Sequence, residues 1–327
     1  MKINHVMSNN VNSGIYEAIV GYFQRYSNEC EIHVSEKPLE NMDIYHYYRP
    51  HLEKKLQENS VVTVHHDLND SDSWLSIDKF IDRYKEAKKI ICLNSNQEKI
   101  LNDLGITQTV VIPHGYNSDI FNINKKRNYQ KKEKLTLGLI SKRYGRKVKG
   151  EAYLYELIKH LDNTKFKFIL VGEGRLEDAS YLNQWGYEVD VYEYLPYPCF
   201  QDLYNKIDFL LMLSKFEGGP ANIPEAIASK TPIISFNIGM VTDYLKDNLN
   251  GIILSGNIKS DSERINDISK KDSIYKSMLK FSNDIPNNLY TWQEVIKQNI
   301  DVYRELVPED DKLTAIQENI FLDSEKV

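Results

Sequence analysis

Short apolar segments alternate with amphipathic segments along nearly the whole 327-residue chain, and this alternation limits the fold more than any other feature. The apolar segments are three to six residues long, which suits buried strands and is too short for buried helices. Most segments between them show the apolar spacing of a helix that covers a sheet. Strands that alternate with helices predict parallel sheets with helices packed on them.

These patterns predict twelve strands and nine helices. The predicted strands are Lys2–Met7, Glu31–Val34, Ile44–Tyr47, Ser60–Val64, Lys89–Leu93, Thr109–Ile112, Leu135–Ile140, Lys167–Val171, Glu188–Tyr192, Phe209–Leu213, Pro232–Ser235 and Gly251–Ile253. The predicted helices are Ile15–Tyr26, Ile77–Ala87, Asn96–Leu104, Glu151–Leu161, Phe200–Asn205, Pro224–Ser229, Val241–Lys246, Ser273–Asn283 and Trp292–Leu306.

The elements fall into two groups, which indicates two doubly wound α/β domains with ligand crevices at the carboxyl ends of their strands. The polar stretch Asn122–Lys134 has few apolar residues and is the predicted linker. We therefore expect an N-terminal domain over residues 1–124 and a C-terminal domain over residues 125–290. Residues 291–327 are expected to form the helix Trp292–Leu306, whose apolar face needs burial, and an acidic tail.

Composition and charge exclude several classes of protein. The formal net charge is −6, so no general attraction to nucleic acid is indicated. Three scattered cysteines without metal-ligand spacing suit a reducing cytosol rather than a disulfide framework. The first ten residues lack the apolar core of a signal peptide, and no apolar run approaches the roughly 20 residues that span a bilayer. We expect a cytoplasmic protein.

The charge is distributed unevenly. Residues 125–149 contain eleven Lys and Arg and a single acid, Glu133. Such a block is often a solvated linker, but it also attracts anionic lipid headgroups or an anionic ligand. A peripheral contact with an anionic membrane, at its inner face, is therefore kept as an expectation.

The segment from Glu217 to Glu225 carries the clearest chemical signal. A short apolar strand leads into Gly218, Gly219, Pro220, Ala221 and Asn222, and a helix follows. Backbone amides at such a turn can hold a diphosphate, and the flanking carboxylates can accept hydrogen bonds from sugar and ribose hydroxyls. The structural alternative is that Asn222 caps the helix, with Glu225 as its capping-box partner.

A cationic loop, Ser141–Gly150, directly follows the strand Leu135–Ile140 and leads into a helix. Arg143 can grip phosphate oxygens in a bidentate way, and Lys149 supplies a point charge. The alternative is a solvated basic loop. Two glycine turns, one at Gly14 and one at Gly172-Glu173-Gly174, follow other strands and can approach a nucleotide or only turn the chain.

His65 and His66 follow the strand Ser60–Val64, where a histidine can bond a substrate or transfer a proton. Adjacent side chains point in opposite directions if the strand continues, so the pair is not expected to share a metal. Asp70-Ser71-Asp72 has the form of a metal-binding D-x-D motif, but solvated acids are the default in such a polar loop. No metal site is expected.

In this order, the motifs resemble those of retaining glycosyltransferases of the GT-B fold, family 4 (glycosyl transferases group 1). Glu217 and Glu225 match their E-x7-E motif, and Arg143 and Lys149 match their cationic pair. His65 matches the histidine that ends a strand of the first domain. Further matches are Ile112–Asn117 to I-P-N-G-V-D, Val171–Gly174 to V-G-x-G, Thr231–Ile234 within the E-x7-E frame, Asn250-Gly251, and Trp292 with its helix.

The resemblance implies two Rossmann-like domains that face a central cleft, with the last helix crossing back to the first domain. It also implies transfer of a sugar from a UDP, GDP or dTDP sugar, without a cofactor or metal, to a glycan or lipid-linked glycan such as a bacterial surface polysaccharide. Arg143 and Lys149 would neutralise the leaving diphosphate, while amides from Gly218 to Asn222 would orient the donor. Glu217 and His65 would hold the transferred sugar, and Glu225 the ribose.

The chain departs from the family pattern at several positions. Ser141-Lys142-Arg143 replaces the usual Gly-Arg, so Lys142 or Arg146 can share the role of Arg143. The doublet leaves His66 as a second choice for the active-site histidine. Two other functions stay open: a nucleotide-sugar epimerase or phosphorylase of the same fold, and a non-catalytic glycan-binding subunit.

Overall fold

The computed structural model describes residues 1–7 and 14–307, which form two compact α/β units. The first unit contains the described residues of the ranges 1–93, 97–112 and 293–307. The second contains residues 94–96 and 113–292. The predicted domain boundaries at residues 124 and 290 stay predictions.

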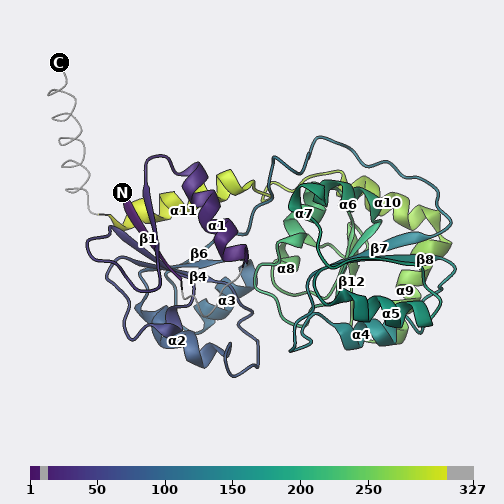
Figure 1. Ribbon diagram of the computed structural model, residues 1–327, viewed down its shortest axis with the longest axis horizontal. Coiled ribbons are helices and arrows are strands. Elements are labelled where there is room, and N and C mark those ends of the chain that lie inside the picture. The colour runs from purple at the N-terminus through teal and green to yellow at the C-terminus, as the bar shows by residue number, and fades with distance from the viewer. Residues whose placement is uncertain (8–13, 308–327) are drawn as a thin grey trace, which may run out of the picture. The chain divides into compact units, whose positions relative to one another are not determined.

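The first unit is a six-stranded parallel sheet with the order β2-β1-β3-β4-β5-β6. Its apolar residues on one face pack under α2 and α3. Its elements are β1 (Lys2–Val6), α1 (Gly14–Tyr26), β2 (Glu31–Ser35), β3 (Ile44–Tyr47), the 3-10 turn η2 (Pro50–Leu52), β4 (Ser60–Val64), α2 (Ile77–Glu86), β5 (Lys89–Cys92), α3 (Ser95–Asp103), β6 (Thr109–Val111) and α11 (Trp292–Leu306) (Figure 1).

The last helix, α11, packs on the first sheet, as the resemblance implied. The Tyr303 hydroxyl lies 2.5 Å from Nδ1 of His46 on β3. The Tyr303 ring stacks on Phe23 of α1 with 6.0 Å between ring centroids. Helices α1 and α11 therefore pack together against β3, which buries the apolar face that the sequence left without a partner.

The second unit is also a six-stranded parallel sheet, with the order β12-β11-β10-β7-β8-β9. The order reverses between the neighbours β7 and β10, which makes the loops after these strands the expected ligand site. Its elements are β7 (Leu135–Ile140), α4 (Glu151–Leu157), β8 (Phe166–Val171), α5 (Arg175–Gln184), β9 (Val189–Tyr192), the turn η3 (Tyr197–Cys199), α6 (Phe200–Lys206), β10 (Phe209–Met212), α7 (Asn222–Ala228), β11 (Ile233–Ser235), α8 (Val241–Tyr244), β12 (Gly251–Ile253), α9 (Ile258–Lys270) and α10 (Asp272–Ser282).

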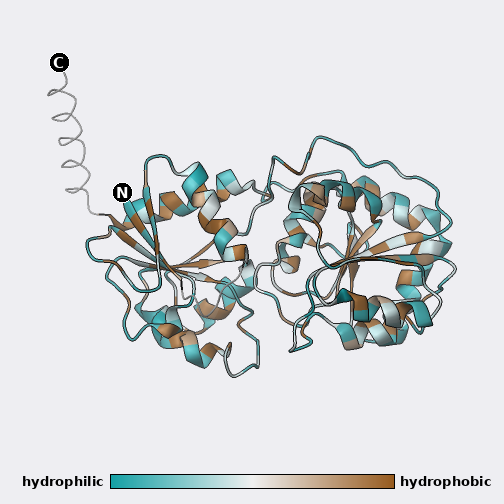
Figure 2. Cartoon of the chain, viewed as in Figure 1, coloured by the Kyte–Doolittle hydropathy of each residue, from teal (hydrophilic) through white to brown (hydrophobic). Residues whose placement is uncertain are grey.

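Alternation along the strands divides the core of the second unit into two layers. Phe209 and Leu211 of β10 pack with α4, α5, α9 and α10, while Leu210 and Met212 pack with α6, α7 and α8. Because both faces are covered, the strands are apolar at nearly every position. Figure 2 shows this as hydrophobic colour along the strands and mixed colour on the helices.

All twelve predicted strands are confirmed to within two residues at either end, and all nine predicted helices are present. Two helices, α5 and α9, were missed because the faces that they turn to the core include buried polar side chains. Arg175 and Asp178 of α5 are fully buried, as is Asp261 of α9. The hydrophobic pattern of a helix is broken where charged residues face inward, so periodicity underestimates such elements.

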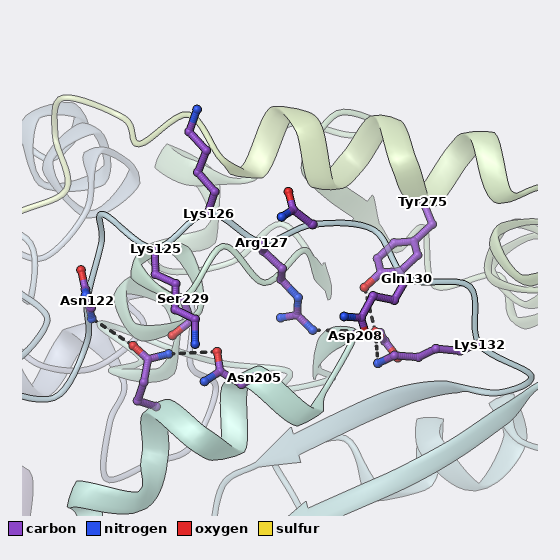
Figure 3. A pocket seen from close by; sticks show the side chains of 12 residues that line it. Asn122, Lys125, Lys126, Arg127, Gln130, Lys132, Asn205, Asp208, Ser229 and Tyr275 are labelled. Carbon is purple, nitrogen blue, oxygen red and sulfur yellow. Dashed lines mark hydrogen bonds and ion pairs between the residues drawn. The ribbon is translucent and has the colours of Figure 1, made fainter.

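The stretch Asn122–Lys134, which the sequence predicted as a linker, lies within the second unit and is held there by Arg127, whose side chain is 13% exposed. The Arg127 guanidinium donates to the Tyr204 carbonyl at 3.0 Å and to the Thr231 hydroxyl at 2.8 Å. It also lies 3.7 Å from the buried carboxylate of Asp208. In Figure 3, Arg127 points toward Asp208, whereas Lys126 points away from both.

Asp208 receives further support from Lys132 at 2.8 Å, from the Tyr275 hydroxyl at 2.7 Å and from the amide of Thr136 at 2.9 Å. The polar pocket above it has a volume of about 290 Å³. Because Asp208 comes just before β10, this pocket lies at the opposite edge of the sheet from the loops that follow β7 and β10.

We expect Arg127→Met to lower the free energy of unfolding by roughly 3 kcal/mol, because it removes a buried partner of a buried carboxylate. Chemical denaturation followed by circular dichroism measures this loss. The control is Lys126→Met, an exposed neighbour, for which the change should stay within about 0.5 kcal/mol. Equal stability of the two variants would show that the linker is not held by Arg127.

Candidate functional site

The loops after β7 and β10 bring together two of the predicted site residues. Lys149 follows β7, Glu217 follows β10, and the Lys149 ammonium forms an ion pair with the Glu217 carboxylate. Their side chains are 16% and 12% exposed, so solvent screens this pair less than a surface pair. Both residues were predicted from the sequence, but their contact was not.

Gly150 lets the two loops approach closely. Its φ is +83°, and a Cβ at this position would lie 2.0 Å from the carbonyl oxygen of Leu213. The same loops are joined by the amide of Lys215, which donates to the Val148 carbonyl at 2.8 Å. Any side chain at position 150 would therefore separate Lys149 from the β10 loop.

Arg143 lies in the same loop as Lys149 but has different partners. Its guanidinium forms an ion pair with Glu177, lies 3.8 Å from Asp178 and is 3.5 Å from the Tyr155 hydroxyl. The side chain is 13% exposed. Arg143 is thus held by helices α4 and α5, and the structure shows no contact between it and Glu217 among the described residues.

A buried arginine that the sequence analysis did not select fixes the start of this cationic loop. Arg175 is fully buried, and its guanidinium lies 2.5 Å from Asp178 and 3.3 Å from Glu151. It also donates to the carbonyl and the hydroxyl of Ser141, at 2.8 and 2.9 Å. The signal in the sequence was weak, an arginine directly after Gly174 and three residues before an aspartate.

Gly172 has no room for a side chain at the same place. Its φ is +135°, and a Cβ would lie 2.5 Å from the Ser141 carbonyl oxygen. The glycine predicted from the V-G-x-G resemblance therefore keeps β8 close to the loop after β7. This close packing is a steric requirement whether or not a nucleotide approaches.

The Gly218-Gly219 turn is held through its carbonyl groups. The Asn94 side-chain amide donates to the Gly218 carbonyl at 2.9 Å, and Nδ1 of His114 lies 2.8 Å from the Gly219 carbonyl. A carbonyl only accepts hydrogen bonds, so the His114 ring must carry a proton on Nδ1. Burial lowers the pKa of His114 to about 4, which makes the ring neutral and leaves Nδ1–H as its donor.

The predicted helix cap is wrong. Helix α7 begins at Asn222 and is preceded by Ala221, which has no capping side chain. Asn222 is inside the helix, and its side chain donates to the Ile140 carbonyl at 3.1 Å. Glu225 does not return to the helix start, because two tyrosines of neighbouring elements hold its carboxylate.

Glu225 is 5% exposed. Its carboxylate accepts hydrogen bonds from the Tyr197 hydroxyl at 2.8 Å and the Tyr204 hydroxyl at 3.1 Å. Burial raises the pKa of Glu225 to about 7, although the two hydrogen bonds act in the opposite direction. Near neutral pH this carboxyl group is therefore present in both protonation states.

The histidine doublet lies in the first unit and separates as predicted. His65 packs against the rings of Tyr16 and Tyr48, with centroids 4.7 and 5.2 Å apart. His66 packs against Phe80 and Tyr84, on the face covered by α2. The two imidazoles are thus on opposite faces of the sheet, and the role of each stays a prediction.

The remaining predicted residues are Gly14 and Asp70 of the first unit and Lys142 and Arg146 of the second. Gly14 is the first residue of α1, and a Cβ there would have no atom within 4 Å, so the space does not require glycine. Lys142 and Arg146 are exposed. Asp70 is buried and accepts a hydrogen bond from the amide of Asp72 at 3.0 Å, as in a turn. Among the described residues, no group of three or more His, Cys, Asp or Glu is placed to hold a metal ion.

The model of the family Glycosyl transferases group 1 matches residues 121–285, just over half of the chain. The chain belongs to this family. The match covers β7 to α10 and includes the cationic loop and both glutamates of the E-x7-E motif.

Two curated relatives match a larger share of the chain than the family model does. A poly(ribitol-phosphate) alpha-N-acetylglucosaminyltransferase of Staphylococcus aureus is 26% identical over 230 residues, which is 67% of this chain and 43% of the relative. An uncharacterized glycosyltransferase of Methanocaldococcus jannaschii is 23% identical over 266 residues, which is 78% of this chain and 71% of the relative. The chain therefore spans less than half the length of the S. aureus enzyme.

Solved structures show the same GT-B fold. A sucrose-phosphate synthase of Thermosynechococcus elongatus has a TM-score of 0.73 at 13% identity, covering 94% of this chain and 99% of its own. Anabaena HepE in complex with UDP and glucose has a TM-score of 0.69 at 14% identity, covering 93% and 100%. S. aureus TarM in complex with UDP has a TM-score of 0.60 at 19% identity, covering 80% and 55%.

The raised pKa of Glu225 predicts a specific pH dependence of stability. The folded-state pKa of about 7 lies above the ordinary value of 4.5, so the folded chain holds this proton more tightly than the unfolded chain does. The resulting contribution to the free energy of unfolding, roughly 3 kcal/mol, is complete below pH 4.5 and is lost as the pH rises through 7. Relative to Glu225→Gln, the wild type should therefore lose stability between pH 4.5 and 7.5 in urea denaturation.

The control for this experiment is Glu263→Gln, which changes an exposed glutamate on α9. Its stability difference from the wild type should be constant over the same pH range. A constant difference for Glu225→Gln as well would mean that Glu225 titrates alike in the folded and unfolded chains.

Proposed function

We propose that this protein is a glycosyltransferase that moves a sugar from a nucleoside-diphosphate sugar to a hydroxyl group of a glycan or lipid-linked glycan. The observation that carries the proposal is the Lys149–Glu217 pair at the point where the strand order of the second sheet reverses. A cation and a carboxylate there match the two halves of a sugar diphosphate: one charged, the other rich in hydroxyls. Membership of the family supports the same assignment.

The donor would be held by residues of the second unit. Lys149 and Arg143 would neutralise the diphosphate as it leaves, which is charge stabilisation of the transition state. Glu217 would accept hydrogen bonds from the transferred sugar. Glu225 would accept hydrogen bonds from the ribose hydroxyls, in place of those that the two tyrosines donate to it. The ribose is the better partner because a carboxylate placed directly on the diphosphate would repel it.

Two finer features of the reaction belong to the proposal. Transfer would retain the anomeric configuration, with the leaving phosphate helping to deprotonate the acceptor hydroxyl. Lys149 and Arg143 would do the work that a metal ion does in other transferases. Of the UDP, GDP and dTDP sugars we favour a UDP sugar, which is supported by the UDP in the structures of HepE and TarM.

The acceptor class is proposed from the relatives. The S. aureus enzyme is named for a polymer, poly(ribitol-phosphate), which supports a surface polysaccharide or its lipid-linked precursor as the acceptor here. His65 would contact the transferred sugar. We place the reaction in the cytoplasm, at the inner face of the membrane, where the basic residues 125–149 would meet anionic lipid. No described helix has the length and hydropathy to cross a bilayer.

The test separates the roles of Lys149 and Glu217 by measuring UDP binding and transfer independently. Lys149→Met removes a cation from the diphosphate, so we expect weaker UDP binding and at least about a hundredfold slower transfer. Glu217→Gln removes a negative charge near the diphosphate, so UDP binding should be kept or tightened while transfer falls to a similar extent. Thermal shift with UDP and release of UDP from UDP sugars are the two readouts.

The matched control is Lys147→Asn, which removes an exposed cation two residues from Lys149 and suits the positive φ of this position. Its UDP binding and transfer should equal those of the wild type. Full transfer activity in Lys149→Met or Glu217→Gln would contradict the assigned roles. Conversion of the donor without any acceptor would instead identify an epimerase.

A further inference from the structure

The first sheet has its own point of reversal, and a group of nitrogen-bearing side chains lies there. In the order β2-β1-β3-β4-β5-β6 the reversal falls between β1 and β3, so ligands are expected at the carboxyl ends of these strands. Arg49 is the second residue after β3, His51 lies in the turn η2, and His66 is the second residue after β4. We call these three residues the Arg49 cluster.

The nitrogens of the Arg49 cluster are buried without hydrogen-bond partners. They are Nε and Nη1 of Arg49 and both ring nitrogens of His51 and of His66. No described residue forms a hydrogen bond with any of these six nitrogens. More than nine in ten buried polar groups in folded proteins have a partner, so six such atoms on three neighbouring residues require an explanation.

Two of the three side chains in the Arg49 cluster pack against one ring, and the charge of the third acts on both of them. The rings of His51 and His66 each lie 4.1 Å, centroid to centroid, from the same buried ring, that of Phe80. The Arg49 guanidinium lies over Tyr16, 5.4 Å from its centroid. His66 is 5% exposed, whereas Arg49 and His51 are partly exposed.

The Arg49 cluster carries positive charge, and no carboxylate of the described residues acts on its two histidines. Burial, together with a smaller effect of the Arg49 charge, lowers the pKa of His66 to about 3 and that of His51 to about 4. The other charged groups that act on them are Lys79, which lowers the pKa of His51, and His51 itself, which lowers that of His66. No carboxylate is among these causes, and the cluster therefore attracts an anion.

We propose that the Arg49 cluster binds a phosphate group of the acceptor, an inference that rests on the proposed transferase function. Arg49 offers two N–H donors in the planar fork that fits oxyanions. A neutral imidazole offers one donor, so the two histidines bring the total to four. The oxygens of a phosphate point to the corners of a tetrahedron and can use donors from several directions, whereas a carboxylate has two oxygens in one plane.

The experiment uses the full chain saturated with UDP, so that the second unit cannot also bind the probe. Glycerol 1-phosphate is titrated by calorimetry, with glucuronate at the same ionic strength as the carboxylate probe. We expect the phosphate to bind and the carboxylate to bind at least about tenfold more weakly. Arg49→Gln should weaken phosphate binding about tenfold or more, while Lys85→Gln, an exposed cation on α2, should leave it unchanged.

A second variant separates binding from folding. His66→Phe keeps a ring against Phe80 but removes two buried nitrogens without partners, so it should raise the melting temperature by about 3 °C and weaken phosphate binding. A lower melting temperature together with unchanged phosphate binding would overturn the proposal. So would stronger binding of glucuronate than of glycerol 1-phosphate, or equal phosphate binding in Arg49→Gln and Lys85→Gln.

The proposed transferase function is judged separately by the UDP shift. Stabilisation of all these variants by UDP, as in the wild type, combined with no binding of glycerol 1-phosphate, would reject the phosphate site and keep the donor site. No stabilisation of the wild type by UDP would reject the proposed function itself.

Discussion

The pairing of β7 with β10 is the constraint on which the candidate donor site depends. These strands are distant in the sequence and adjacent in the sheet, with Phe209 opposite Leu137 and Leu210 opposite Gly138. The loops that follow the two strands leave the sheet at the same edge. Because the strand order reverses here, the helices that follow these loops turn to opposite faces of the sheet, and none lies between the loops. Everything placed there, from the Lys149–Glu217 pair to the Gly218-Gly219 turn, follows from that adjacency.

Buried charge, rather than apolar packing, sets the detail around this site. Arg175 ties the loop after β7 to α4 and α5, and Arg127 ties the linker to the amino edge of the same sheet. Groups of this kind contribute little net stability, because removing charges from water is costly. Their geometry is restrictive, however, and it fixes backbone positions that an apolar contact would leave adjustable.

The sequence was sufficient for the strands, because a strand covered on both faces is a continuous apolar run. It also selected Lys149 and Glu217, which the structure brings into contact, and their roles stay a proposal. It was insufficient for helix α5, because charged residues such as Arg175 and Asp178 are expected to face solvent. It was also insufficient for the partners of Glu225. A glutamate three residues after an asparagine is typical of a capping box. That Tyr197 and Tyr204 bind this glutamate instead is seen only in the folded structure.

The tyrosine-bound glutamate gives the second unit a chemical property that its loops alone do not have. A carboxyl group with a pKa of about 7 is partly protonated in a neutral cell. Any ligand whose hydroxyls donate to Glu225 selects the ionised form, so its binding is accompanied by the release of a fraction of a proton. Affinity at this position is then linked to the pH of the medium, through a carboxyl group rather than through a histidine.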